Sequence, residues 1–149
     1  MKLTKTKIIS LTKIKEPFLM IDNVSKIIPL KSGVGSKKID KKSWFFKCHF
    51  TNNPVMPGSL IQESVLQTIV SILYSNKMFK NKICLIVSTQ TNFYLKVNKQ
   101  DKLKIYVKII KITKTKVQAS ATVYNRDKKK IASGLYKYIT TYNLNAKKK

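Results

Sequence analysis

The sequence is poor in several residue types on which common protein functions depend. It has one arginine, one histidine, two cysteines and six acidic residues. Cys48 and Cys84 lie far apart and show no C-x-x-C spacing, so we expect neither a disulfide framework nor a thiol-based metal site. With His49 as the single imidazole, a zinc site is not expected either. Unpaired thiols fit a reducing, cytoplasmic compartment.

Long hydrophobic runs are also missing. No stretch approaches the roughly 18 apolar residues of a membrane span, and the apolar part of the basic first segment is too short for a signal peptide. We therefore expect a cytoplasmic protein without a membrane span. Its 149 residues, 43% of them hydrophobic, suffice for one compact domain. We expect that domain to span residues 1–149, with a basic lead and short helix at 1–16 and a frayed tail at 141–149.

The scarcity of acidic residues leaves a formal net charge of +25, which comes from lysine, since Arg126 is the only arginine. Such a charge attracts acidic partners, which include nucleic acid, an anionic membrane and an acidic carrier protein. Nucleic acid is an unlikely partner because base recognition usually relies on arginine. The lysines are spread evenly along the chain, so a coding sequence rich in A and T is the simpler explanation. Charge alone therefore identifies no ligand.

The longest regular pattern predicts a helix at residues 59–76. Pro54 and Pro57 prevent an earlier start, and Ser59 with Gln62 three residues later predicts a capping box. Apolar residues cover more than one face of this helix, so we expect it to be buried on most sides. These residues are Leu60, Ile61, Val65, Leu66, Ile69, Val70, Ile72 and Leu73.

Strand patterns surround this helix in the sequence. Residues 24–30 predict a first strand, and Gly33 and Gly35 mark a turn after it. The polar residues 36–44 predict an exposed or edge strand. The apolar run at residues 83–87 predicts a central strand that is covered on both faces.

The second half of the chain follows a period of two residues. Apolar and polar residues alternate at 103–109 and at 117–123, which predicts two half-buried antiparallel strands. Residues 131–140 predict a last strand, with Gly134 as a candidate bulge. The pattern as a whole predicts an α+β fold, in which a curved antiparallel β-sheet wraps around one long central helix.

The only histidine and one of the two glutamates lie on either side of the proline-rich turn before the helix. With residues 17–24, PFLMIDNV, they form a motif at fixed intervals: His49 and Phe50, PVMPG at residues 54–58, Glu63, and Gln67. By this motif the chain resembles the 3-hydroxyacyl-[acyl-carrier-protein] dehydratases of the FabZ type, which have the hot-dog fold. The resemblance extends from Pro17 to the last predicted strand.

This resemblance implies a hydro-lyase in fatty-acid or related acyl-chain biosynthesis. The enzyme would remove water from a 3-hydroxyacyl thioester to give the trans-2-enoyl thioester, without a metal or redox cofactor. Its substrate would be held by an acidic acyl carrier protein, which would give the lysines a use. The resemblance also implies a homodimer, in which the histidine of one subunit meets the glutamate of the other. Assembly into a trimer of dimers stays open, as do acyl chain length and the choice between carrier protein and coenzyme A.

The chemistry of this elimination gives each motif residue a role. A base with a pKa near neutrality must remove the proton beside the thioester carbonyl, and His49 is the only candidate imidazole. Glu63 can protonate the leaving hydroxyl if burial keeps its carboxyl neutral. Gly58 can offer a backbone N–H to the thioester oxygen at the start of the helix. Gln67, one turn after Glu63, can hold its carboxyl by a hydrogen bond.

Two other functions stay open at this stage. A hot-dog acyl thioesterase would share the fold but hydrolyse the thioester. A non-catalytic hot-dog module would bind acyl chains or polyanions, with His49 as a packed histidine beside aromatic rings and Glu63 on the helix surface. Cys48 is expected to pack on the face opposite His49, since neighbours on a strand point to opposite sides.

Overall fold

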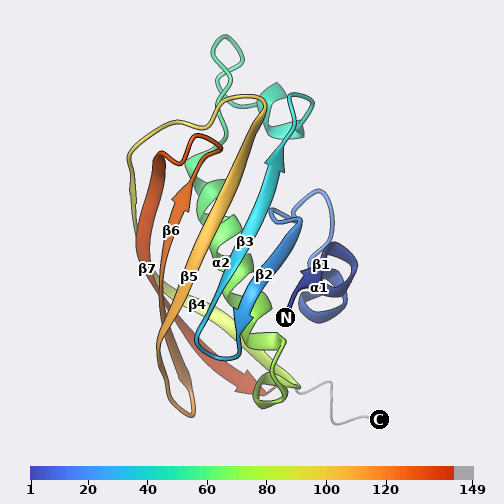
Figure 1. Ribbon diagram of the computed structural model, residues 1–149, viewed down its shortest axis with the longest axis vertical. Coiled ribbons are helices and arrows are strands. Elements are labelled where there is room, and N and C mark those ends of the chain that lie inside the picture. Colours follow the sequence, from blue (N-terminus) through green and yellow to red (C-terminus); the bar gives the residue numbers. More distant parts are fainter. Residues whose placement is uncertain (143–149) are drawn as a thin grey trace.

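The computed structural model describes residues 1–142, which form one antiparallel sheet and one long helix with shorter helices beside them (Figure 1). The strands are β1 (Leu3–Thr4), β2 (Asn23–Ile28), β3 (Ser32–Ile39), β4 (Lys82–Phe93), β5 (Asp101–Ile112), β6 (Lys116–Tyr124) and β7 (Lys130–Tyr142). The helices are α1 (Lys5–Thr12) and α2 (Gly58–Tyr74), and two 3-10 turns are η1 (Trp44–Lys47) and η2 (Lys77–Phe79). Residues 141 and 142 of the expected frayed tail belong to β7, and the rest of that tail lies outside the described residues.

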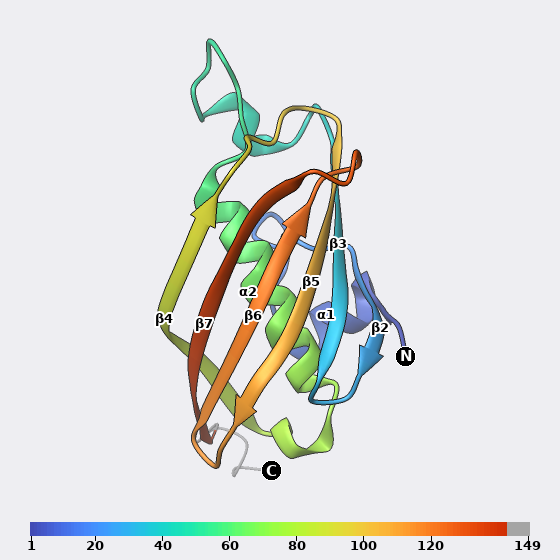
Figure 2. The ribbon, with the colours of Figure 1, turned by 60° about the vertical axis from the view of Figure 1, so that its left-hand side comes forward.

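The seven strands follow the order β1-β2-β3-β5-β6-β7-β4, and every neighbouring pair is antiparallel. The sheet curves around α2, which runs along its inner face (Figure 2). The predicted sheet around one long helix is therefore confirmed. Because β1 and β4 are the edges of this sheet, each has one side that makes no backbone ladder within the described chain.

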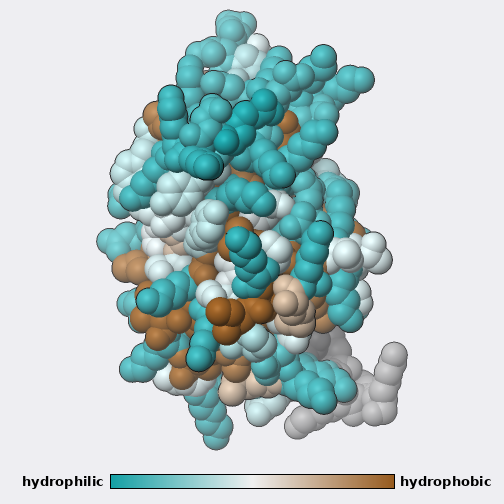
Figure 3. All heavy atoms as spheres, in the orientation of Figure 1, coloured by the Kyte–Doolittle hydropathy of each residue, from teal (hydrophilic) through white to brown (hydrophobic). Residues whose placement is uncertain are grey.

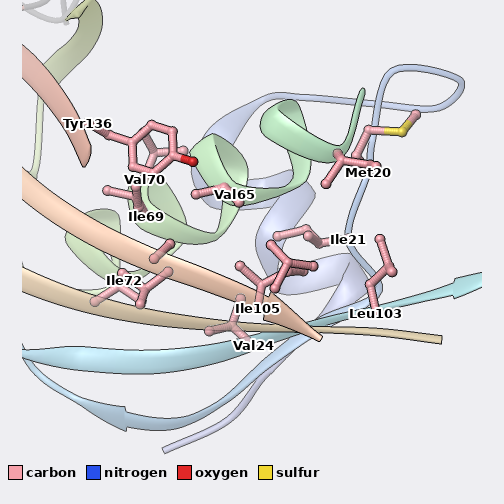
Figure 4. Close-up of a cluster of buried hydrophobic side chains, with 14 of the residues drawn as sticks. Met20, Ile21, Val24, Val65, Ile69, Val70, Ile72, Leu103, Ile105 and Tyr136 are labelled. Carbon is pink, nitrogen blue, oxygen red and sulfur yellow. The ribbon is translucent and has the colours of Figure 1, made fainter. Parts of the chain in front are cut away.

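The hydrophobic core lies between α2 and the inner face of the sheet. Figure 4 shows Val65, Ile69 and Ile72 of the helix on the side of Ile105, and all four side chains are buried. Burying each of them stabilises the fold by about 1.5–3 kcal/mol relative to exposure. The predicted alternation is confirmed, since the inward residues of both strands are buried: Leu103, Ile105, Val107, Ile109, Val117, Ala119, Ala121 and Val123.

The start of α2 differs from the predicted capping box. The helix begins at Gly58, with Pro57 as its N-cap, and no side chain caps it. The carbonyl of Pro57 accepts from the amides of Leu60 and Ile61 at 3.0 and 3.1 Å. Ser59 therefore already lies inside the helix and cannot cap it. A proline with its fixed φ places the first turn without help from a hydroxyl.

Gly33 and Gly35 lie inside β3, so the turn predicted for them is wrong. The turn occupies residues 29–31 instead. A Cβ on Gly35 would lie 2.3 Å from Thr68 Oγ1, and one on Gly33 would lie 2.8 Å from Ile72 Cδ1. The two glycines therefore let α2 approach the sheet closely, which no larger residue would permit.

The centre and the edge of the sheet are exchanged relative to the sequence prediction. Residues 36–39 of the segment 36–44, expected as an exposed or edge strand, belong to β3, which pairs with β2 and β5 on its two sides. The run 83–87, expected at the centre, lies in the edge strand β4. Leu85 and Val87 are 49% and 57% exposed. Within residues 1–142, nothing covers these apolar side chains.

Other local predictions meet mixed outcomes. The helix expected in the amino-terminal lead is confirmed as α1, whose Ile8 is fully buried in the core. The bulge expected at Gly134 is wrong, since this residue pairs regularly with Ala121 of β6 and Thr91 of β4. A Cβ there would lie 2.3 Å from the carbonyl oxygen of Gln90, so the glycine serves close packing.

Candidate active site

His49 lies in the connection between η1 and α2, with its ring half-buried. Its Nδ1 is 2.9 Å from the carbonyl oxygen of Val55. Because a carbonyl only accepts, Nδ1 carries the proton, and in the neutral ring Nε2 is left with a free lone pair. The ring packs against Phe50, with centroids 4.3 Å apart. This geometry suits a general base and differs from a histidine with both nitrogens satisfied.

The segment around His49 is fixed by one long-range and one local backbone hydrogen bond. The amide of Met56 donates to the carbonyl of Val97 at 2.9 Å, and the amide of Asn53 donates to that of Phe50 at 2.7 Å. Of the aromatic residues just before and after His49, Phe50 contacts the imidazole, whereas Phe45 is buried in the core. These hydrogen bonds fix the backbone of residues 50–56, the segment that follows His49.

The expectation that Cys48 packs inside the protein is wrong. The residue follows a 3-10 turn rather than lying on a strand, and it is exposed. The strand rule of opposite faces therefore does not apply to Cys48 and His49.

Glu63 and Gln67 form a hydrogen-bonded pair on α2. Gln67 Nε2 donates to Glu63 Oε1 at 2.9 Å and to the carbonyl of Phe18 at 2.8 Å. Gln67 Oε1 accepts from the amide of Met20 at 2.7 Å. The side chain of Gln67 is thus locked by the segment before β2, and it fixes the carboxyl of Glu63 in turn.

The environment of Glu63 favours its neutral form. Burial raises the pKa of the Glu63 carboxyl, and the hydrogen bond from Gln67 lowers it by a smaller amount. A carboxyl that holds its proton longer can act as a donor, and this is the condition that its proposed role requires.

Glu63 opens into a largely apolar cavity of about 270 Å³ between α2, β4 and β7. Its lining residues are Thr12, Ile14, Glu63, Leu66, Gln67, Val70, Tyr74, Ile83, Cys84, Ile86 and Tyr138. The walls are held by side-chain bonds, since the Tyr138 hydroxyl donates to the Leu66 carbonyl at 3.1 Å and the amide of Cys84 donates to the Tyr74 hydroxyl at 2.9 Å. Burial raises the pKa of Cys84 to about 11, so this thiol stays protonated at neutral pH.

Gly58 lies on a different hollow, of about 310 Å³, next to the end of β4. A Cβ on Gly58 would lie 3.3 Å from the ring of Phe93. Since Gly58 is the first residue of α2, its amide belongs to the first turn, whose donors have no partner inside the helix. The positive end of the helix dipole therefore points into this hollow.

The described chain brings together some of the expected residues but not all of them. Glu63 and Gln67 are in contact, whereas His49 and Gly58 are not among the residues that line the Glu63 cavity. Sequence reasoning missed the backbone groups of Phe18 and Met20 that hold Gln67. Residues 17–24 were part of the motif, but nothing in the sequence indicated that their backbone would bind the side chain of Gln67.

Metal and membrane features are absent from the part of the chain that the structure describes. Within residues 1–142, no group of three or more His, Cys, Asp or Glu side chains could hold a metal ion. No helix in the same residues has the length and apolar character needed to cross a membrane.

Comparisons with known proteins agree on one family. Residues 14–134 match the family described as FabA-like domain. The 3-hydroxyacyl-[acyl-carrier-protein] dehydratase FabZ of Clostridium kluyveri is 39% identical over 114 residues, which cover 76% of this chain and 79% of that protein. The enzyme of the same name from Enterococcus faecalis is 35% identical over 113 residues, covering 75% and 80%.

Comparisons with solved structures identify the fold. A hypothetical thioesterase with coenzyme A from Streptococcus pneumoniae matches with a TM-score of 0.64 at 13% identity, covering 90% of this chain and 91% of the other. The PaaI protein of Escherichia coli matches with a TM-score of 0.63 at 10% identity, covering 78% and 80%. The expected hot-dog fold is confirmed. At such low identity these two matches indicate the fold alone and do not favour hydrolysis.

Proposed function

This chain belongs to the FabA-like family, and on that premise we propose that it is a 3-hydroxyacyl-[acyl-carrier-protein] dehydratase of the FabZ type. The observation that carries the proposal is the Glu63 carboxyl, which is held by Gln67 at the wall of an apolar cavity and has a raised pKa. A thioesterase would need an activated water, whereas this elimination needs a proton donor beside an acyl chain. The cavity offers room for the acyl chain, and the raised pKa of the Glu63 carboxyl favours the proton-donating form.

The reaction requires one proton to leave carbon 2 and another to reach the oxygen on carbon 3. His49 takes the first proton on Nε2, while its Nδ1 donates to Val55. The electrons of the broken C–H bond form the new double bond between carbons 2 and 3. The C–O bond breaks as Glu63 protonates the hydroxyl, which leaves as water. The amide of Gly58 stabilises the negative charge that develops on the thioester oxygen.

The positions of these residues favour a site that two copies of the chain share. The Glu63 cavity is lined by Ile83 and Ile86 near the start of β4, whereas the Gly58 hollow is lined by Phe93 at its end. If two copies pair antiparallel along β4, the start of each strand lies beside the end of the other. Each Glu63 cavity then meets the Gly58 end of the partner, the end from which His49 extends.

The edge strand β4 is suited to such pairing. Its outer side makes no ladder within the described chain, and Leu85, Ile86 and Val87 are 49%, 40% and 57% exposed. An exposed apolar edge is a template for another strand. A homodimer would cover these side chains. The mass of the particle in solution distinguishes a single dimer from an assembly of three dimers.

The charge of the protein fits an acidic acyl carrier protein as the bearer of the substrate. The net charge of +25 would speed the encounter with such a carrier and make binding sensitive to salt. The free thiols of Cys48 and Cys84 suit the reducing cytoplasm as the place of this reaction.

The first test measures interconversion of a 3-hydroxyacyl and a trans-2-enoyl group on acyl carrier protein. We expect His49→Ala and Glu63→Gln each to lower turnover by a factor on the order of 100 or more, as for positioned acid and base groups. The matched controls Cys48→Ala, beside the histidine, and Glu16→Gln, an exposed glutamate, should keep wild-type turnover. Release of free carrier thiol instead of the enoyl product would mean hydrolysis and would refute the assignment.

The second test mixes the two inactive variants after joint unfolding and refolding. Random pairing makes half of the dimers mixed, and in these one of the two shared sites keeps both His49 and Glu63. About a quarter of wild-type turnover should therefore return. If each chain held a complete site of its own, mixing would restore nothing, and the shared-site proposal would be wrong while the dehydratase assignment stood.

A further inference from the structure

The outer face of the sheet carries another concave site, at the end where β5 begins and β6 ends. This groove, here called the basic groove, has a volume of about 770 Å³ and is lined by Lys102, Lys104, Tyr106, Thr122, Tyr124, Asn125, Arg126 and Lys128. Its strand residues alternate with the buried Leu103, Ile105 and Val107, so they point away from α2. Figure 3 shows this face, where hydrophilic residues gather over the upper half and apolar ones over the lower half.

Two tyrosines form the floor of the basic groove. Tyr106 and Tyr124 come from neighbouring strands, with ring centroids 5.7 Å apart and ring planes at 84°. Lys104 is paired with Tyr124 in the ladder and Thr122 with Tyr106, so the two rings are diagonal neighbours on one face. Tyr106 is 48% exposed. Two nearly perpendicular rings, one exposed and the other half-buried, form a corner in which a flat ring can stack.

Four cationic side chains surround this aromatic corner. Lys102 and Lys104 come from β5, and Arg126 and Lys128 come from the turn between β6 and β7. Asp101 lies nearby, and its Oδ1 accepts from the amides of Lys102 at 2.7 Å and Arg126 at 3.1 Å. In residues 1–142 the ion pairs join Lys5 to Glu16 and Lys37 to Asp22, outside the groove. The four cations are thus available to an anion.

The turn that presents Arg126 is held in one shape. The side-chain oxygen of Asn125 accepts from the amides of Asp127 at 3.0 Å and Lys129 at 2.9 Å. The hydrogen bond from the Arg126 backbone amide to Asp101 Oδ1 ties the same turn to the start of β5. The backbone that carries the only arginine of the chain is therefore held at the rim of the groove, and guanidinium suits the geometry of phosphate oxygens.

We propose that the basic groove binds a nucleotide, with its aromatic base against Tyr106 and Tyr124 and its phosphates on the surrounding lysines and Arg126. The volume of about 770 Å³ lies within the range of small-molecule sites. A second copy of this chain would bring like charges together at this face. An acidic protein would satisfy the cations but would leave the aromatic corner unused. The same chemistry occurs in free nucleoside polyphosphates and in the nucleotide half of coenzyme A.

The test measures binding to the wild-type protein by calorimetry at about 0.15 M salt, where weak surface attraction is largely screened. The probes are ATP, coenzyme A, inorganic triphosphate and adenosine. We expect ATP or coenzyme A to bind at least about tenfold more tightly than triphosphate, because stacking adds to charge. The tighter of the two ligands identifies the source, a free nucleotide or the nucleotide of a thioester carrier.

Variants assign the binding to the groove. Tyr106→Leu and Arg126→Gln should each weaken binding of the tighter ligand by about tenfold, through lost stacking and a lost charge-assisted bond. The controls Tyr142→Leu, an exposed tyrosine below Lys82, and Lys137→Gln on the same sheet should bind like wild type. All four substitutions are at exposed positions, so the fold is expected to be kept and circular dichroism checks it.

Several results would overturn the nucleotide assignment. Equal affinity for ATP, coenzyme A and triphosphate would mean attraction by charge alone, as would equal losses in the control variants. A single-stranded oligonucleotide that bound far more tightly than any mononucleotide would mean a strand-binding surface. Loss of acyl carrier binding in Arg126→Gln, without nucleotide binding to the wild type, would assign the groove to an acidic protein. None of these results bears on His49 or Glu63, so the dehydratase proposal is tested separately.

Discussion

Replacing Gln67 by leucine tests both the stability and the chemistry of the candidate site. The side chain makes three hydrogen bonds, to Glu63, Phe18 and Met20. Leucine has a similar size but leaves a backbone amide and a backbone carbonyl without their partner. A buried group that loses its partner costs about 1–3 kcal/mol, so for the two groups we expect a loss of about 2–6 kcal/mol in the free energy of unfolding. In urea, this lowers the midpoint by on the order of 1 M at fixed protein concentration.

The same variant should change the pH dependence of turnover in a defined direction. The bond from Gln67 lowers the pKa of Glu63, while burial raises it. Removing the bond raises that pKa further, so the alkaline limb of kcat/KM, where the acid loses its proton, should move to higher pH. Gln62→Leu is the matched control on the same helix, since Gln62 accepts one bond, from Thr91 at 2.8 Å. Gln62→Leu should lower the free energy of unfolding by about 1 kcal/mol and leave the alkaline limb of kcat/KM in place. Equal stability losses in the two variants, or a limb that stays or moves to lower pH after Gln67→Leu, would refute the reasoning.

Two further predictions concern Glu63 and the contact between helix and sheet. Because burial raises the pKa of Glu63 above its ordinary value of 4.5, the folded state holds this proton longer than the unfolded chain, and stability falls as pH rises from about 4.5 through the raised pKa. In urea unfolding curves recorded from about pH 4.5 upward, Glu63→Gln should remove this decrease in the free energy of unfolding. If the variant keeps the pH dependence of the wild type, the pKa of Glu63 is not raised. Gly35→Ala places a Cβ 2.3 Å from Thr68 Oγ1 and should cost about 1–3 kcal/mol by overpacking. Thermal unfolding of the double variant Gly35→Ala/Thr68→Ala should show a smaller loss of stability than the sum of the losses in the two single variants. If the double variant loses the full sum, the two residues do not clash.

The sequence predicted best the parts of the fold that rest on local periodicity. The strands of β5 and β6 follow from alternating residues such as Leu103 and Ile105, and α2 follows from apolar residues on a wide arc. The position of a strand within the sheet is a different matter. The apolar run in β4 has the same composition whether its own chain or a second copy covers it, and Gly35 lacks a Cβ in a turn and in a close contact alike. Only the three-dimensional arrangement separates these cases.

The candidate site was predictable as a set of residues but not as a geometry. The motif identified His49, Gly58, Glu63 and Gln67, and the structure places Gln67 against Glu63 as expected. The partner of His49 Nδ1 is a backbone carbonyl, which every residue possesses, so no sequence pattern distinguishes Val55. The basic groove was hidden for a related reason: its cations are a few among many lysines, and only strand pairing brings them around two tyrosines.

The position of β4 in the sheet also affects the order in which the protein is completed during synthesis. Within the described chain, β4 pairs only with β7, which leaves the ribosome after β5 and β6. At about 5–20 residues per second, β4 waits some seconds for this partner. The helix α2 can form earlier from local bonds, but the cavity beside Glu63 needs Ile83 and Ile86 from β4 and Tyr138 from β7. A nascent chain that stalls before β7 would therefore present Glu63 without an acyl cavity, together with a loose apolar strand as a target for chaperones.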